Sequence, residues 1–344
     1  MSRFKTAPLA AALTAAIFSS AQAAHKIVVF DAPGAGTSDF QGTFVAGISA
    51  KGTIAGYIVN ADGADRGFTR APSGTITMFD APGAGTDQNE GTVVGAISSN
   101  GRIAGVYRDA SNVQHGYVRL ADGSLTTFDV NGAVNGLNVT GINKAGTATG
   151  IFYDANNVAR CFLRSAAGAI TAFNPKNSDN CYANGIGDDG SVIGAYQAGS
   201  TYGAFLRGRK GKTTAFAPNG TKYVEAMRIN AAGQIAGNFT DTADLTHGML
   251  READGTLLTF DVANAAYTVG WGIGEDGSIV GYEGGGNFVS KAFVRSPGGG
   301  IVTFTASSGT TAGTGTYAYG IDAHGRVAGN VRDDGGPTRG FFRN

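Results

Sequence analysis

The sequence is poor in the features that mark several large classes of protein. Charged side chains make up only 15% of the 344 residues, and the 26 basic residues balance the 26 acidic ones. This balance gives no reason to expect nucleic acid or an anionic membrane surface as a partner. Beyond residue 23, no apolar run is long enough for a transmembrane helix, and no long helical periodicity of apolar residues is present.

The first 23 residues read as a signal peptide. Two basic residues precede a short apolar stretch over residues 7–18, and AQA at 21–23 offers the small residues that a signal peptidase reads. We therefore expect cleavage after Ala23 and a single secreted domain, residues 24–344, in the periplasm or outside the cell. An uncleaved membrane anchor is the alternative, but the apolar stretch is short for a membrane span.

Cysteine is nearly absent as well. The chain has only Cys161 and Cys181. In an exported protein two thiols more often pair than stay free, so we expect a disulfide between them. Two buried or idle thiols are the alternative.

Glycine, by contrast, is abundant, and much of it belongs to a repeat. The chain has 56 glycines, and the pattern I-x-x-x-G-x-[IVA]-x-G returns at intervals of 43–49 residues. Its turn glycine falls at Gly52, Gly101, Gly146, Gly190, Gly233, Gly277 and Gly325. Seven copies at this period indicate repeated supersecondary units rather than separate domains.

One copy of the repeat reads as four short strands. The first copy predicts strands over residues 43–49, 53–59, 66–70 and 75–80, separated by turn residues. Four antiparallel strands in about 45 residues match one blade of a β-propeller. The fold prediction is therefore all-β: a seven-bladed β-propeller.

The two ends of the chain bear on whether the ring closes. The last copy stops before its fourth strand, whereas HKIVVFDAPGA at 25–35 matches the fourth strand of the first copy, TITMFDAPGA at 75–84. We predict that this N-terminal strand completes the last blade, closes the ring and hides its sheet edges. Alternation along the strands predicts that Ile48, Ile54, Phe68 and Phe79, with their equivalents, fill the space between blades.

The repeat resembles the bacterial extracellular HAF-type repeat, whose units carry a GIN-x-x-G-x-x-x-G line followed by a His-Ala-Phe line. The similarity spans residues 25–344, although HGY at 115–117 and HGM at 247–249 are the nearest approaches to His-Ala-Phe. The resemblance implies secretion and a propeller-like fold. It implies no catalytic residues.

Several short motifs resemble nucleotide-binding or metal-binding patterns but lack the spacing or the neighbouring elements that such sites need. GIGDDG at 185–190 and GIGEDG at 272–277 match a nucleotide-binding pattern, but a strand follows where that mechanism needs a helix. The acidic turns at 60–65 and 188–190 lack the ligand spacing of a calcium loop, and the four histidines lack zinc spacing. We expect no metal and no cofactor.

An arginine recurs at one position of the third strand in every copy. These residues are Arg70, Arg119, Arg164, Arg207, Arg251, Arg295 and Arg343. A ring of charge around an anion is one interpretation, but the third strand is not the innermost, so the ring would be too wide for a small ligand. We expect instead a recurrent bond to a carboxylate or carbonyl at the end of the fourth strand, where Asp31, Asp80, Asp129 and Asp261 stand.

Departures from the repeat point to a candidate binding site. Six copies carry Gly or Ala before the isoleucine of the first strand, whereas the fifth carries Arg228, with Glu225 nearby. Tyr182, Trp271 and Tyr319 stand on other first strands, which line the channel of a propeller, and an aromatic platform there would suit a sugar or a peptide side chain. Ordinary packing, with an ion pair between Glu225 and Arg228, is the alternative.

The function hypothesis is a monomeric binding module for an extracellular protein or glycan, with no catalysis of its own. A glycosidase or lyase that uses carboxylates at the channel mouth is the first alternative, and clustered carboxylates with raised pKa values would favour it. A structural envelope or matrix component without a discrete site is the second. A propeller fold alone does not choose among them.

Overall fold

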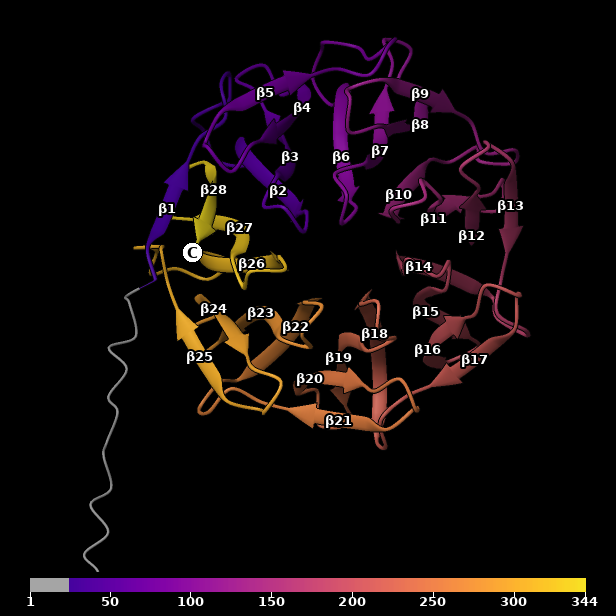
Figure 1. The fold of residues 1–344 in the computed structure, drawn as a ribbon, viewed down its shortest axis with the longest axis vertical. Coiled ribbons are helices and arrows are strands. Elements are labelled where there is room, and N and C mark those ends of the chain that lie inside the picture. The colour runs from indigo at the N-terminus through magenta and orange to yellow at the C-terminus, as the bar shows by residue number, and fades with distance from the viewer. Residues whose placement is uncertain (1–24) are drawn as a thin grey trace, which may run out of the picture.

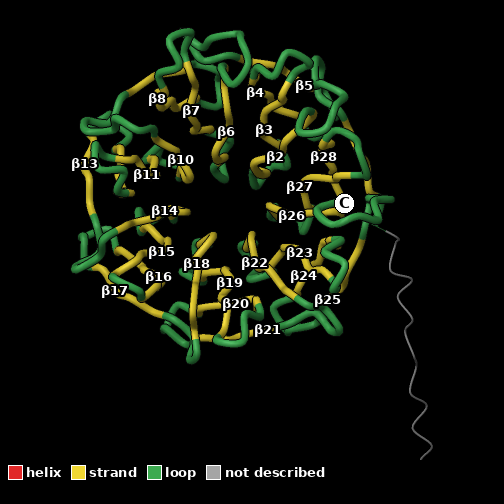
Figure 2. Tube along the Cα trace, turned by 180° about the vertical axis from the view of Figure 1, so that it is seen from behind, coloured by secondary structure: helices red, strands yellow, loops and turns green. Residues whose placement is uncertain are grey.

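The computed structural model describes residues 25–344, so the expected signal peptide lies outside the described residues. All regular elements in this range are strands, and they are arranged around a common centre (Figure 1). Figure 2 shows the same arrangement from behind, with loops joining the strands. Over residues 25–344 there is no helix long and apolar enough to cross a membrane.

Each repeat forms four strands that pair antiparallel in chain order. The innermost strands are β2 (Gly42–Ile48), β6 (Gly91–Ile97), β10 (Leu137–Ile142), β14 (Asn180–Ile186), β18 (Thr221–Ile229), β22 (Tyr267–Ile273) and β26 (Gly315–Ile321). The second strands are β3 (Ile54–Val59), β7 (Ile103–Arg108), β11 (Ala148–Tyr153), β15 (Val192–Ala198), β19 (Ile235–Asp241), β23 (Ile279–Gly284) and β27 (Val327–Arg332).

The outer half of each repeat is equally regular. The third strands are β4 (Asp65–Arg70), β8 (Gln114–Arg119), β12 (Ala159–Arg164), β16 (Thr201–Arg207), β20 (Thr246–Arg251), β24 (Ser290–Arg295) and β28 (Thr338–Arg343). The outermost strands are β5 (Ile76–Phe79), β9 (Leu125–Phe128), β13 (Ile170–Phe173), β17 (Thr213–Phe216), β21 (Leu257–Phe260), β25 (Ile301–Phe304) and β1 (Ile27–Phe30). In the first copy, the strand bounds agree with the predicted ones to within one residue.

Strand β1 lies beside the last strand of the chain. It pairs antiparallel with β28, with Ile27 opposite Arg343 and Phe30 opposite Gly340. The backbone N–H of Asn344 also donates to the carbonyl of Lys26 at 3.2 Å. The segment that matches a fourth strand in the sequence therefore takes that position next to the last repeat (Figure 1).

The core lies between neighbouring sheets, and the four predicted residues of the first copy belong to it or pack against it. Ile54 and Phe68 are completely buried, as predicted, and Phe79 is half-buried. Ile48 is half-buried, packs against the same core cluster as Ile54 and Phe68, and also lines a central cavity. A bulge between Val45 and Gly47 lies just before it in the strand.

The recurrent arginines pack on aromatic rings of the preceding sheet. In each case the guanidinium carbon lies 4.7–5.1 Å from the centre of a phenylalanine ring. The pairs are Arg70–Phe30, Arg119–Phe79, Arg164–Phe128, Arg207–Phe173, Arg251–Phe216, Arg295–Phe260 and Arg343–Phe304. Each contact joins two neighbouring sheets through a cation–π interaction, so the structural interpretation of these arginines holds.

The predicted partner of the arginines was nevertheless wrong. Asp80 accepts hydrogen bonds from Arg66, at the other end of the third strand, and Asp129 and Asp261 bind histidines at the equivalent position. The carboxylates of Asp80, Asp129 and Asp261 are thus already engaged on the loop side. The guanidinium of Arg70, at the opposite end of its strand, meets an aromatic face instead.

Two sets of loops share one face of the molecule. A single parallel bridge pairs the start of a third strand with the start of the next innermost strand, as between Asp65 and Gly91. The same bridge recurs between Gly42 and Thr338, Thr246 and Tyr267, and Ser290 and Gly315. The loops that precede these strands therefore lie side by side, and we call this side the loop face.

Candidate functional site

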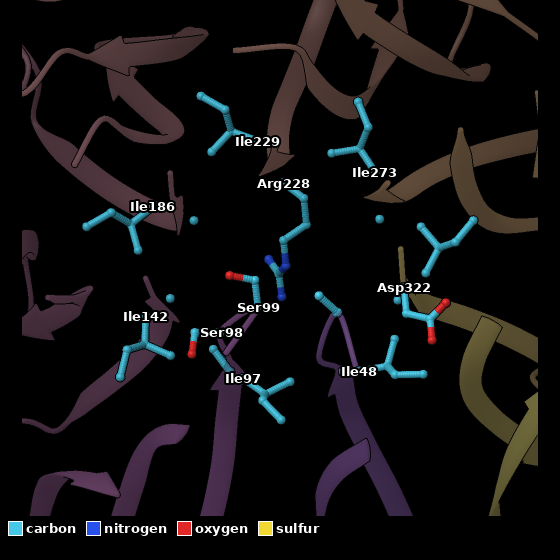
Figure 3. A pocket seen from close by; sticks show the side chains of 18 of the residues that line it. Ile48, Ile97, Ser98, Ser99, Ile142, Ile186, Arg228, Ile229, Ile273 and Asp322 are labelled. Atoms are coloured by element: carbon cyan, nitrogen blue, oxygen red, sulfur yellow. The ribbon is translucent and has the colours of Figure 1, made fainter. Parts of the chain in front are cut away.

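Arg228 extends into the centre of the molecule from the innermost strand β18. A bulge separates Ala226 from Arg228, and the equivalent positions on the neighbouring strands are Gly185 and Gly272. A Cβ atom at Gly272 would come within 2.8 Å of the carbonyl of Tyr319, so the repeat leaves little room there. Arg228 takes the one position of this kind with a long side chain, and Figure 3 shows it pointing toward the middle of the cavity.

The guanidinium of Arg228 has only backbone partners. Its Nη1 donates to the carbonyls of Asn184 at 2.9 Å and of Met227 at 2.8 Å. Among the described residues, no carboxylate forms an ion pair with it, and Nε and Nη2 make no hydrogen bond. Burial lowers the pKa of Arg228 to about 10, so it remains charged at neutral pH. One edge of the charged guanidinium group is thus free to bind an anion.

On one side of Arg228 lies a cavity of about 160 Å³ that we call the isoleucine cavity. One isoleucine from the end of each innermost strand lines it: Ile321 and the six that Figure 3 labels, Ile48, Ile97, Ile142, Ile186, Ile229 and Ile273. The carboxylates on its wall have other partners, because Asp188 pairs with Lys144, Asp322 pairs with Arg326, and Glu275 accepts from a backbone N–H.

On the other side of Arg228 lies a second cavity, of about 300 Å³, that we call the aromatic cavity. Its wall carries the rings of Phe44, Tyr57, Trp271 and Tyr319. The rings of Trp271 and Tyr319 are 5.1 Å apart, and those of Phe44 and Tyr57 stack at 5.1 Å. Flat apolar faces therefore surround the route to a free guanidinium edge, which suits a ligand with an apolar face and a carboxylate.

The tyrosines around this cavity stay neutral. Burial raises the pKa of Tyr57 to about 12, with the nearby charge of Asp65 adding to the effect. Burial also raises the pKa of Tyr282 to about 12 and the pKa of Tyr319 further still. At neutral pH these phenols are protonated and do not act as bases.

Three of the five predicted channel residues come together and two stand apart. Arg228, Trp271 and Tyr319 line the aromatic cavity. Glu225 accepts a hydrogen bond of 2.7 Å from the hydroxyl of Tyr223, and the ion pair with Arg228 expected under ordinary packing is not formed. Tyr182 packs against the hydrophobic core around Cys181 and does not line either cavity.

The sequence signal for the remaining wall residues was available but weak. Phe44 precedes the last residue before the bulge of its innermost strand, and Tyr182 and Glu225 hold the equivalent position in other copies. Tyr57 is on the second strand β3, whereas all the predicted site residues are on innermost strands. Aromatic residues are common in strands, so neither residue stood out by type.

The disulfide lies away from the cavities. Cys161 and Cys181 are bonded in the structure, with their Cα atoms 5.4 Å apart, and both are completely buried. Cys161 is on β12 and Cys181 is on the innermost strand β14, so the bond joins two neighbouring sheets. Its contribution is to the scaffold that positions the cavities.

Carboxyl groups with raised pKa values do not gather at either cavity. Burial raises the pKa of Asp65 to about 7 and also raises the pKa of Glu283, and these are the two such groups within residues 25–344. They are in different repeats and neither lines a cavity. No group of three or more His, Cys, Asp or Glu side chains in that range could hold a metal ion.

Comparison with known proteins identifies the fold only. No family model matches the chain, and no curated protein matches it in sequence. Among solved structures, a streptogramin B lyase is 14% identical with a TM-score of 0.57, and the match covers 93% of this chain and 98% of that chain. A selenomethionine-substituted virginiamycin B lyase from Staphylococcus aureus is 15% identical, with a TM-score of 0.54 and coverage of 93% and 100%.

TolB from Acinetobacter baumannii is 13% identical with a TM-score of 0.50, and the match covers 83% of this chain and 64% of that chain. At such identities the likeness concerns the arrangement of strands and not the chemistry. The described part of this chain is therefore an all-β protein with the propeller-type fold of these structures.

Proposed function

We propose that this chain is a secreted propeller of seven blades, closed by β1, that binds an acidic unit of an extracellular glycan at Arg228. The closed ring is supported by the pairing of β1 with β28 and by Arg70, which packs on Phe30 as its equivalents pack on theirs. Secretion is supported by the leader-like residues 1–23 and the disulfide. The repeat line supports kinship with the HAF-type repeat proteins.

The observation that carries the proposed binding function is the free guanidinium edge inside an aromatic wall. Arg228 is half-buried, and a partly desolvated charge without a counter-charge is costly, so its retention is explained if a ligand supplies the anion. A carboxylate matches the guanidinium fork. The rings of Trp271 and Tyr319 offer faces on which a sugar ring can stack, and tyrosine hydroxyls nearby can bind sugar hydroxyls.

A glycan fits these features better than a peptide strand does. Addition of a peptide strand needs free backbone groups along a sheet edge. Here, side chains already occupy several backbone carbonyls facing the centre: Thr140 Oγ1 donates to Ala183 at 2.6 Å, and Asn184 Nδ2 donates to Ala226 at 3.1 Å. The ligand would instead be recognised by the faces of aromatic side chains and by the charge of Arg228. This mode of recognition suits a sugar acid.

The alternatives have less support. A carboxylate-dependent glycosidase needs a pair of carboxyl groups flanking the ligand, and the raised pKa values of Asp65 and Glu283 belong to groups outside both cavities. A lyase that used a tyrosine base would need a lowered pKa, whereas the pKa of Tyr57 is about 12. A purely structural component would give no reason for the unpaired Arg228.

The test compares acidic and neutral oligosaccharides on a glycan array and by calorimetry, using the purified secreted protein. We expect binding to oligosaccharides that contain a uronic acid. Arg228→Gln should weaken that binding about tenfold to a hundredfold, because hydrogen bonds to a charged group contribute about 1.5–3 kcal/mol. Arg209→Gln, at an exposed arginine outside both cavities, is the matched control. Equal affinities of wild type and Arg228→Gln would overturn the proposed site.

A further inference from the structure

Two exposed phenylalanines adopt a backbone conformation that bulky residues rarely take. Phe40 has a φ of 63° and is 73% exposed, and Phe288 has a φ of 56° and is 60% exposed. Other copies place Asn89 or Gly313 where Phe40 stands, and Asn112, Asn157 or Asp244 where Phe288 stands. Asn, Asp and Gly tolerate positive φ, whereas phenylalanine is strained there.

Both residues lie on the loop face. Phe40 belongs to the loop between β1 and β2, and Phe288 to the loop between β23 and β24. The carbonyl of Phe288 accepts a hydrogen bond of 3.1 Å from the N–H of Gly313 in the neighbouring loop, which holds its backbone in place. Folding alone does not require either ring, because the other copies make the same turns without one. An outlier of this kind at an exposed position motivates a functional explanation.

Only Phe288 connects to the aromatic cavity. Its ring stacks on Tyr267 at 6.2 Å with an interplanar angle of 17°. The ring centres of Tyr267 and Tyr282 are 6.4 Å apart, and those of Tyr282 and Trp271 are also 6.4 Å apart. The ring centre of Trp271 lies 5.1 Å from that of Tyr319. These five rings, which we call the aromatic series, run from the exposed rim of the loop face to the wall beside Arg228.

The chemistry of the aromatic series is uniform. None of its members is charged, since burial raises the pKa of Tyr267 and raises that of Tyr282 to about 12. The hydroxyl of Tyr267 is held by a hydrogen bond of 2.8 Å with Ser290. The series therefore offers successive apolar faces with neutral hydroxyls at their edges. That pattern matches the alternating faces and hydroxyls of a chain of sugar rings.

We infer that Phe288 is an outer contact for an extended oligosaccharide whose acidic unit lies at Arg228. This inference rests on the proposed function and adds the size of the ligand: a chain of several sugar units that runs along the aromatic series, rather than a single terminal sugar. The strained turn is then explained, because it presents a ring at the rim in the one copy whose loop leads toward Trp271.

Phe40 provides the matched control. It is at least as exposed as Phe288 and has the same sign of φ, but its ring contacts the guanidinium of Arg332 at 5.0 Å. Among the described residues it makes no ring contact with the aromatic series. A general effect of removing an exposed ring from the loop face should therefore appear equally in Phe40 and Phe288 variants.

The experiment measures the affinities of Phe288→Asn, Phe40→Asn and Arg228→Gln for acidic di- and hexasaccharides of one series. Asparagine suits positive φ, so both Phe variants should fold with at least wild-type stability, which thermal unfolding checks. We expect Phe288→Asn to weaken hexasaccharide binding about three- to tenfold, as loss of one aromatic contact predicts. The affinity of Phe288→Asn for the disaccharide should equal that of the wild type. Phe40→Asn should bind both oligosaccharides with wild-type affinity.

The outcomes separate the two proposals. If Arg228→Gln loses binding but Phe288→Asn binds the hexasaccharide like wild type, the inference is wrong and the proposed function stands. An equal loss in Phe40→Asn and Phe288→Asn, or an equal loss for both ligand lengths in Phe288→Asn, also overturns the inference. If no acidic oligosaccharide binds, or if an acidic peptide binds in its place, the proposed function and the inference fall together.

Discussion

The closing role of β1 can be tested with a pair of matched substitutions, Phe30→Ala and Phe128→Ala. Phe30 lies over Gly340, 6.2 Å from the ring of Phe68 and 4.9 Å from the guanidinium of Arg70. Phe128 lies over Gly116, 6.1 Å from Phe162 and 5.0 Å from Arg164. The surroundings are thus nearly identical, but Phe30 pairs with Gly340, at the other end of the chain, whereas Phe128 pairs with Gly116 in its own repeat.

The expected loss of stability follows from these contacts. Truncation of a buried phenylalanine to alanine costs about 3–5 kcal/mol, and both rings are only half-buried, so the lower end applies. The lost cation–π contact is included in that loss and contributes about 0.5–1 kcal/mol. We therefore expect each substitution to lower the free energy of unfolding by about 3 kcal/mol.

Urea unfolding followed by the fluorescence of Trp271, the single tryptophan, measures this free energy. The two variants should agree to within about 1 kcal/mol, with an unchanged dependence on urea concentration. A double-mutant cycle of Phe30→Ala with Arg70→Ala should give a coupling of about 0.5–1 kcal/mol. If Phe128→Ala destabilises the protein but Phe30→Ala does so by less than about 0.5 kcal/mol, β1 does not close the structure in solution.

Two further predictions concern the scaffold. Cys161→Ser with Cys181→Ser should lower the free energy of unfolding by about 3 kcal/mol, because the bond closes a loop of 20 residues; an unchanged urea midpoint would contradict this. Burial lowers the pKa of His115 and of His247, but hydrogen bonds to two aspartates each outweigh it, so both pKa values are raised above 6.5 in the folded protein. Their contribution to stability should be complete below pH 6.5 and should be lost as pH rises through the folded pKa. His115→Gln with His247→Gln should remove that slope from urea midpoints measured between about pH 6 and 8, and a persisting slope would refute the assignment.

Local pattern was sufficient for the strands and for part of the site. Strand type and bounds follow from alternation and from glycines that the turns require, such as Gly52, with a φ of 86° between β2 and β3. Arg228 was found because it departs from the glycine or alanine that the other copies carry, and a regular repeat makes such a departure visible. The position of β1 followed from its likeness to β5.

The cavity at the end of the innermost strands could not be predicted. Ile48 and Ile54 pack in one core cluster, yet Ile54 is completely buried whereas Ile48 is half-buried and also lines the central cavity. A bulge between Val45 and Gly47 precedes Ile48, and a bulge recurs at the equivalent place in every innermost strand, beside the residue before the isoleucine. A strand with one extra residue reverses its two faces, so an error of one position changes the predicted lining of the whole channel.

The sequence by itself determined the all-β composition, the repeat and its strand bounds, the pairing candidates Cys161 and Cys181, and the exceptional residue Arg228. Only the tertiary structure decided which groups meet between repeats: the phenylalanine faces beneath the arginines, the absence of a carboxylate partner for Arg228 among the described residues, and the ring series from Phe288 to Tyr319. The physical reason is that strand periodicity is a local property of the chain, whereas these contacts depend on the distance and twist between neighbouring sheets.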